Sequence, residues 1–67
     1  MIKNLTQVKE AVLLLMQKKD NGVFDWLFDA DKIDADGGMI DKALSMLIED
    51  RKIVRLSWNF GNRWGLL

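Results

Sequence analysis

The chain is 67 residues long, and its ten basic residues balance its ten acidic residues. It contains neither cysteine nor histidine, which excludes disulfides, the usual zinc sites and a histidine general base. A chain of this length is expected to form one small domain, spanning residues 1–67.

The charges are segregated along the chain, although they sum to zero. Residues 1–19 hold four lysines and one glutamate, and residues 42–67 hold five basic and two acidic residues. The middle, residues 20–41, holds seven aspartates and one lysine. This contrast between basic ends and an acidic middle bears on the choice of partner.

Nothing in the sequence indicates a membrane or an export route. It has no run of about 20 apolar residues that would span a bilayer. Its first residues lack the basic start and apolar run of a signal peptide. We therefore expect a soluble, cytoplasmic domain with no membrane partner.

A first helix is predicted near the N-terminus. Asn4 is a suitable N-cap, and Gln7 stands three residues later, as in a capping box. The helix should end near Lys18-Lys19, because cations suit a helix C-terminus and Asp20-Asn21-Gly22 is typical of a turn. Spacings of three and four predict one apolar face, made of Leu5, Val8, Ala11, Val12, Leu15 and Met16.

A short strand at residues 23–26 and a second helix, from Asp25 or Trp26 to Lys32, are predicted next. Ile33 follows the helix into the core, and residues 34–38 form a turn. Asp36 can cap a third helix, which Lys52 closes. The buried face of this helix is predicted to hold Ile40, Ala43, Leu44, Leu47 and Ile48.

The last residues predict a β-hairpin whose register depends on its loop. A three-residue loop, Asn59-Phe60-Gly61, gives glycine the left-handed conformation and makes Trp58 face Asn62. A two-residue loop would put the two tryptophans on opposite faces. The three-residue loop predicts that Leu56 faces Trp64 and Val54 faces Leu66. One face is then apolar, and the other carries Arg55, Ser57, Arg63 and Gly65.

The order of helix, short strand, helix, tight turn, helix and hairpin resembles the winged-helix superfamily along the whole chain. Its most specific stretch is the third helix running through EDRKIVRLSW into NRWGLL. The helix-to-wing spacing and the closing Trp64-Gly65-Leu66 are also similar to the small winged-helix accessory protein of dissimilatory sulfite reductases. The resemblance implies an α+β fold, mainly α, with three helices, a small antiparallel sheet and a C-terminal wing.

In DNA-binding members of the superfamily, the third helix enters the major groove and the wing contacts the backbone or the minor groove. The resemblance therefore implies nucleic-acid contacts from Lys42 and Ser45 on the exposed helix face, with Lys52 at its edge. Only Lys42 belongs to the side chains that commonly read base edges, so this face is poorly suited to sequence readout. The rest of the face is predicted to hold Met39, Met46 and Glu49.

Arg55 and Arg63, on the predicted outer face of the wing, are the best candidates for contacts to phosphates or to a narrow minor groove. Alternatively, they form a solvated strand face that protects an edge from aggregation. The acidic segment beside the third helix weighs against DNA, because it would repel phosphates. A dimer could carry that acidic surface away from the duplex.

Met39 and Met46 lie seven residues apart on one line of the predicted helix, and Phe60 stands at the tip of the wing. These three residues are candidate contacts for a protein partner or a second subunit. Alternatively, the methionines are loosely packed surface residues and the Phe60 ring folds over the hairpin.

Leu13 and Leu14 fall outside the apolar face of the first helix, and Ile2 lies on nearly the same side as Leu13. Winged-helix proteins often dimerise through terminal helices, so these three residues are candidate contacts of a homodimer. The alternative is that they pack against Leu67.

Neither a metal site nor an active site is expected. Asp34, Asp36 and Gly37 have the spacing of part of an EF-hand loop, but Lys32 and Ala43 occupy the positions of two essential ligands. The carboxylates of the turn face solvent, where nothing would raise a pKa for acid–base catalysis. So small a core also leaves little room for a pocket. We therefore expect no catalytic residue, no cofactor and no small-molecule substrate.

Two functions remain. The sequence predicts a non-catalytic winged-helix transcription regulator that binds DNA through the third helix and the wing. The alternative is a protein-interaction module or accessory subunit that binds no nucleic acid. The distribution of charge separates them, because a DNA-binding protein requires one continuous basic surface made of Lys42, Lys52, Arg55 and Arg63.

Overall fold

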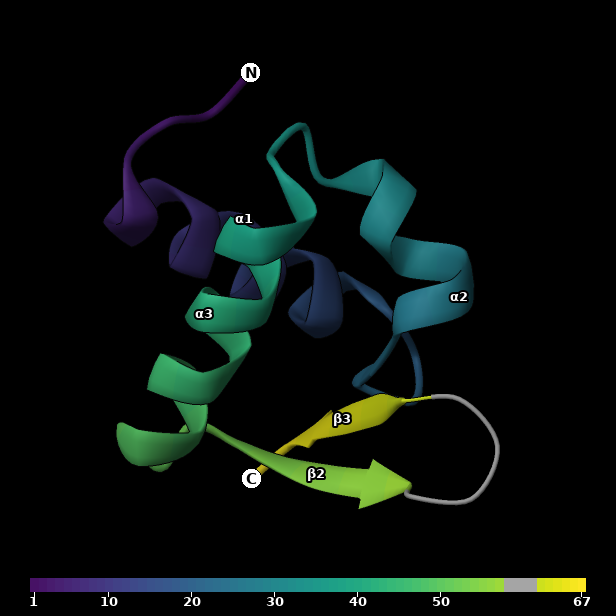
Figure 1. The fold of residues 1–67 in the computed structure, drawn as a ribbon. Helices are drawn as coiled ribbons and strands as arrows, with labels where there is room; N and C mark the ends of the chain where they lie inside the picture. Colours follow the sequence, from purple (N-terminus) through teal and green to yellow (C-terminus); the bar gives the residue numbers. More distant parts are fainter. Residues whose placement is uncertain (58–61) are drawn as a thin grey trace.

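The computed structural model describes residues 1–57 and 62–67, which form a small, mainly helical α+β domain (Figure 1). Its helical segments are α1 (Leu5–Lys18), α2 (Trp26–Asp29), the 3₁₀ helix η1 (Ala30–Lys32) and α3 (Gly37–Glu49). Its strands are β1 (Val23–Asp25), β2 (Ile53–Ser57) and β3 (Arg63–Leu66). Within these described ranges, no helix is long and apolar enough to cross a lipid bilayer.

The core lies where α1, α3 and one face of the sheet meet (Figure 1). Val8, Val12 and Met16 of α1 are fully buried, as their spacing of four residues predicts. The predicted face of α3 is wrong only at Ile48, which is 38% exposed. Ile48 is turned about 100° from its buried neighbour at the end of the helix. The other predicted residues of α3 are buried: Ile40, Ala43, Leu44 and Leu47.

Both predicted helix N-caps are confirmed. Asn4 Oδ1 accepts a hydrogen bond from the backbone N–H of Gln7 at 3.3 Å, and Asp36 Oδ2 accepts one from Gly38 at 3.1 Å. The predicted turn through residues 34–38 is wrong for Gly37 and Gly38, which form the first turn of α3. The Asp36 carboxylate allows this, because it satisfies a backbone N–H that has no partner within the helix.

The second helix is shorter and less regular than predicted. Asp25 Oδ1 accepts a hydrogen bond from the Leu27 N–H at 3.1 Å, so Asp25 ends β1 and caps α2. After four residues the α-helix tightens into η1, which ends at the predicted Lys32. Ile33 then enters the core as predicted, with only 7% of its surface exposed.

The sheet is antiparallel with the strand order β1-β3-β2, so the last strand of the chain lies between the other two. On the helix-facing side, Phe24 of β1 lies opposite Trp64 of β3, and both side chains are buried. Their rings meet edge to face with centroids 6.0 Å apart. Ile53 of β2 is also buried, which completes this side of the core.

The predicted hairpin register is confirmed at Ser57, which pairs with Arg63, but it is wrong by one residue beyond the bulge between Arg55 and Ser57. There the structure pairs Arg55 with Trp64 and Val54 with Gly65. A shift of one residue exchanges the two faces of a strand. Leu56 is therefore 47% exposed, and its side chain occupies the space that Gly65 leaves open. The predicted positions of Trp58 and of the loop Asn59-Phe60-Gly61 lie outside the described residues.

A two-bond cap ends α3. The backbone N–H of Arg51 donates to the Ile48 carbonyl, and the N–H of Lys52 donates to the Leu47 carbonyl, each at 3.0 Å. This pairing is the Schellman motif, whose first residue beyond the cap takes a left-handed conformation and is usually glycine. Here that residue is Arg51, with φ of 60°.

Replacing Arg51 with glycine should raise the free energy of unfolding by about 1 kcal/mol, because an L-residue is strained in this conformation. Chemical denaturation monitored by circular dichroism measures the change. The matched control is Glu49→Gly, two residues earlier inside the helix, which should lower the same quantity. A destabilised Arg51→Gly variant would contradict the prediction.

Candidate functional site

The exposed face of α3 is narrower than the sequence predicts. Lys42, Ser45 and Glu49 are exposed as expected. Met39 and Met46 are half-buried, and Met39 packs against the core, because both border the buried face of the helix. The predicted methionine surface is therefore smaller than expected. Phe60, its predicted companion on the wing, lies outside the described residues.

Arg55 and Arg63 do not share a face, contrary to prediction. Arg55 pairs with Trp64 across the ladder, whereas Arg63 precedes Trp64 on β3. Consecutive residues of a strand point to opposite faces. Arg55 therefore lies on the helix-facing side of the sheet, and Arg63 lies on the outer side. The bulge after Arg55 produces this shift.

Arg55 lies beside an aromatic cluster that leads toward the start of α3. Its guanidinium carbon is 5.7 Å from the centre of the Trp64 ring, and its Nη2 donates a hydrogen bond to Asn62 Oδ1. Trp64 contacts Trp26, with centroids 6.3 Å apart. Trp26 in turn lies close to Gly37, the first residue of α3. Arg55 is thus on the same side of the sheet as α3.

Lys52 lies beyond the C-terminal end of α3. Together with Arg51 it borders a hollow near the C-terminus, which Leu66 and Leu67 also line. The four predicted basic contacts are therefore divided: Lys42 is on α3, Lys52 is beyond its end, Arg55 is on the helix side of the sheet, and Arg63 is on the outer side. These four residues therefore do not form the single continuous basic surface that was predicted for a DNA-binding protein.

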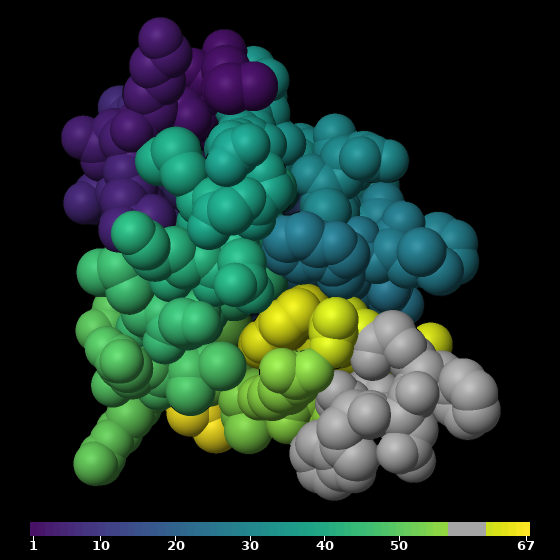
Figure 2. Space-filling model, viewed as in Figure 1, coloured from purple at the N-terminus to yellow at the C-terminus, as the bar shows by residue number. Residues whose placement is uncertain are grey.

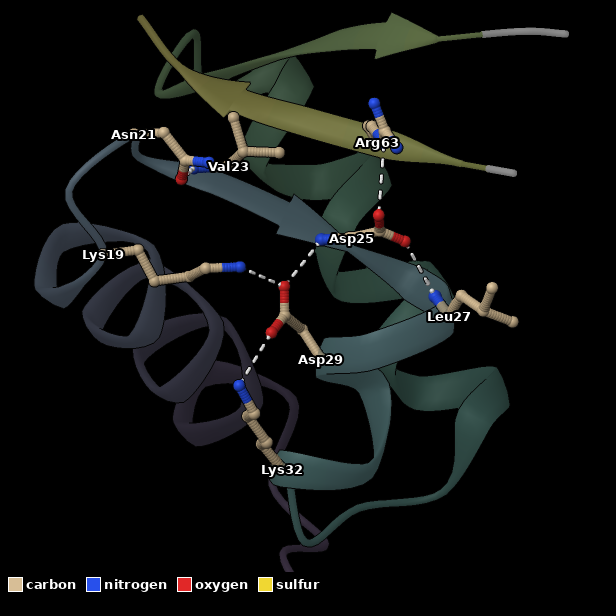
Figure 3. Close-up of polar contacts among 8 residues, drawn as sticks. All are labelled: Lys19, Asn21, Val23, Asp25, Leu27, Asp29, Lys32 and Arg63. Carbon is tan, nitrogen blue, oxygen red and sulfur yellow. Dashed lines mark hydrogen bonds and ion pairs between the residues drawn. The ribbon is translucent and has the colours of Figure 1, made fainter. Parts of the chain in front are cut away.

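The outer side of the sheet holds a second group of charged residues (Figure 3). Arg63 Nε donates to Asp25 Oδ2 at 3.1 Å, which joins β3 to β1. Next to this pair, Lys19 extends from the end of α1 and Lys32 extends from η1, and both reach Asp29. These residues border an open hollow with a volume of about 710 Å³.

Asp29 is the centre of this group and is fully buried. Its Oδ2 accepts hydrogen bonds from Lys19 Nζ at 2.5 Å and from the Asp25 backbone N–H at 2.8 Å. Its Oδ1 accepts from Lys32 Nζ at 3.1 Å. One carboxylate thus joins α1, β1, α2 and η1 (Figure 3).

The pKa of Asp29 lies below its ordinary value of 3.8. Burial acts in the opposite direction and raises the pKa, because it disfavours the charged form. The hydrogen bonds from the Asp25 N–H, Lys19 and Lys32 outweigh it, since each favours the carboxylate. Asp29 is therefore a permanently charged link at neutral pH.

Asp29 was not among the predicted site residues, because the aspartates of residues 20–41 were expected to cap helices and to keep the turn soluble. The available signal was Lys32, which stands three residues later and can reach the same helix face. Lys19 is ten residues away in the sequence, and no local pattern indicates that it meets Asp29.

The acidic segment, residues 20–41, carries less uncompensated negative charge than its composition predicts. Asp25 pairs with Arg63, Asp29 pairs with two lysines, and Asp34 pairs with the N-terminal amine at 3.2 Å. Much of the charge of residues 20–41 is therefore compensated within the fold. The remaining aspartates are exposed: Asp20, Asp31, Asp36 and Asp41.

The three candidate dimer residues are placed in two groups. Leu13 is half-buried and borders the same hollow as Leu67. Leu14 is 51% exposed and borders a different groove together with Ile2. The expectation that Ile2 lies on the side of Leu13 is therefore wrong. Ile2 lies away from Leu13 because its backbone N–H donates a hydrogen bond to the Asp34 carbonyl. This bond holds the N-terminal residues beside the turn before α3.

Within residues 1–57 and 62–67, no three acidic side chains gather in a way that could hold a metal ion. The chain matches no protein-family model, no curated protein and no solved structure.

Proposed function

We propose that the chain is a non-catalytic winged-helix regulator that binds duplex DNA through α3 and the helix-facing side of the hairpin. The observation that carries the proposal is the position of Arg55 on the side of the sheet where α3 also lies. Figure 2 shows α3 and β2 side by side on one face of the molecule. The element order and the strand order β1-β3-β2 also fit a winged helix.

The absence of one continuous surface made of all four basic residues weighs against DNA binding, so the proposal rests on a smaller set of contacts than the sequence predicts. Lys42 and Ser45 on α3 face solvent and are proposed to enter a groove, while Arg55 contacts a phosphate. Lys52, beyond the end of the helix, supplies a further positive charge. Arg63 is removed from the set, because it pairs with Asp25 on the opposite face.

The compensated aspartates also support the proposal. Phosphate neutralisation dominates non-specific affinity, so uncompensated carboxylates near the interface would oppose binding. Asp25 and Asp29 are each held by basic side chains on the outer side of the sheet, away from the proposed interface. The exposed Asp41 and Glu49 on α3 remain as unfavourable charges there.

Binding to a random duplex should weaken steeply with salt, and Arg55→Ala should reduce the slope of log K against log salt by about 0.9. Arg63→Ala is the matched control, because it removes the same side chain from the opposite face and should leave the slope unchanged. Fluorescence anisotropy measures both, with circular dichroism confirming that each variant is folded.

Arg55→Lys separates the charge of the side chain from its shape, since it retains the positive charge and should retain most of the salt dependence. Absence of binding at low salt would rule out the DNA proposal. Equal losses in Arg55→Ala and Arg63→Ala would contradict the assignment of the interface to the helix-facing side.

A protein-interaction module is the second candidate. It is favoured by Leu27 and Phe28, adjacent on α2, which are 74% and 67% exposed. Large apolar side chains placed together on a surface commonly mark a contact site.

Homodimerisation through Leu14 is a related proposal. Sedimentation velocity tests it, because Leu14→Lys should convert a dimer to a monomer, and a monomeric unmodified protein would contradict it.

A further inference from the structure

The hollow on the outer side of the sheet combines charged and apolar walls. It lies between the end of α1, β1, α2, η1 and the hairpin, and it has a volume of about 710 Å³. This volume is within the range of small-ligand sites, roughly 300–1,000 Å³. Six of the side chains that border it are Lys19, Val23, Phe28, Lys32, Leu56 and Arg63.

The carboxylates of the hollow are already bonded. Both oxygens of Asp29 accept hydrogen bonds, from Lys32 on one side and from Lys19 and the Asp25 N–H on the other. Asp25 accepts from the Leu27 N–H with one oxygen and from Arg63 with the other. Each lysine ammonium has three donors and the Arg63 guanidinium has five, so the hollow has an excess of donors over acceptors.

The charges of the hollow do not cancel. Lys19, Lys32 and Arg63 supply three positive charges, and Asp25 and Asp29 supply two negative charges. Because Arg63 and Asp25 neutralise each other, the excess positive charge lies at the two lysines that share Asp29 (Figure 3). A ligand with one negative charge would neutralise the site.

The apolar wall lies beside these cations. Phe28 is 67% exposed and Leu56 is 47% exposed, although both side chains are strongly hydrophobic. Val23, which is half-buried, also lines the hollow. An apolar body of ligand size would remove part of this surface from water, which is favourable.

We propose that this hollow binds a small organic monoanion in which a single carboxylate is attached to an aromatic or aliphatic body. The carboxylate lies between Lys19 and Lys32, and the apolar body lies against Phe28 and Leu56. The sequence-based expectation of no small-molecule ligand is replaced by this proposal, which is independent of DNA binding.

A titration with 2-naphthoate and with its uncharged analogue 2-naphthamide tests the proposal, using backbone amide chemical shifts of the ¹⁵N-labelled protein. Naphthoate should shift the amides of β1 and η1 and should bind at least about tenfold more tightly than naphthamide, because a charge-assisted hydrogen bond is lost in the amide. Equal affinities, or naphthoate shifts located elsewhere, would overturn it.

Two variants assign the roles of the walls. Lys32→Gln should weaken naphthoate about tenfold and leave naphthamide unchanged, while Asp29 keeps its bonds to Lys19 and the Asp25 N–H. The control is Lys42→Gln on α3, which should change neither affinity.

Phe28→Ala should weaken the binding of both compounds. Its control is Leu27→Ala, which alters an exposed neighbour that does not line the hollow. Equal effects within either pair would overturn the assignment.

Discussion

Replacing Asp29 with asparagine should lower the free energy of unfolding by about 3 kcal/mol. The carboxylate is fully buried and receives three hydrogen bonds, two of them from lysines. An amide of the same shape carries no charge, so Lys19, which is 28% exposed, loses its counter-charge in a partly buried position. Urea denaturation followed by tryptophan fluorescence measures the loss.

The matched control for this substitution is Asp31→Asn. Asp31 lies in η1, two residues from Asp29, but its side chain is exposed. Surface substitutions of this kind usually change stability by less than about 0.5 kcal/mol. If Asp29→Asn were as stable as Asp31→Asn, the carboxylate would not be the structural link that its contacts indicate.

The same contacts predict how stability depends on pH. The folded-state pKa of Asp29 is lowered, so its contribution to stability is fully present above the ordinary value of 3.8. That contribution is lost as the pH falls through the lowered pKa of the folded state. Unfolding free energies measured from about pH 6 to about pH 2 should therefore fall less steeply in Asp29→Asn. Identical slopes in the two proteins would contradict this prediction.

Replacing Trp64 with alanine should lower the free energy of unfolding by about 4 kcal/mol. Its ring is only 4% exposed and lies between Phe24, Trp26 and the guanidinium of Arg55. Because β3 is the central strand, the cavity would open at the point where all three strands meet. A domain of this size has a total stability on the order of 3–10 kcal/mol, so the loss is comparable with the whole.

Thermal unfolding monitored by circular dichroism tests this prediction. Leu27→Ala is the control, because it also removes a large apolar side chain but from a position that is 74% exposed. Trp64→Phe should lie between the two, since it retains an aromatic ring. An unchanged unfolding midpoint in Trp64→Ala would show that the aromatic cluster contributes little to the fold.

The helices could be predicted because their signals are local. Asn4 and Asp36 each bond to a backbone N–H within three residues, so the sequence alone is enough to place these caps. The burial of Val8, Val12 and Met16 likewise follows from the period of a single helix. These features do not depend on the rest of the fold.

The hairpin register could not be predicted in the same way. The register was predicted from the alternation of apolar residues in the two hairpin strands alone. In the structure, β3 pairs with β1 as well as with β2. Trp64 must face Phe24 on the helix side, and a bulge on β2 adjusts the remaining residues. The division of Arg55 from Arg63 is a direct result, so the candidate DNA-binding surface changed with the register.

The outer hollow was missed for a related reason. Its cations come from α1, η1 and β3, which are distant in the sequence. Only Lys32 and Asp29 have a helical spacing that a local pattern can detect. The hollow therefore follows from the tertiary arrangement of the helices and the sheet.

The side-chain bonds at β1 also have a consequence for assembly. The Gly22 carbonyl accepts a hydrogen bond from the Leu66 N–H, and the Trp26 N–H donates to the Asn62 carbonyl. Because alternate residues of a strand bond to opposite sides, the N–H groups of Val23 and Asp25 point away from β3. Asn21 Oδ1 accepts from the first at 3.0 Å, and Asp29 Oδ2 accepts from the second at 2.8 Å. An edge strand whose outward N–H groups are already bonded is a poorer template for another chain. A strand that added to the sheet at β1 would first have to displace these two hydrogen bonds, so β1 is protected against edge-to-edge association.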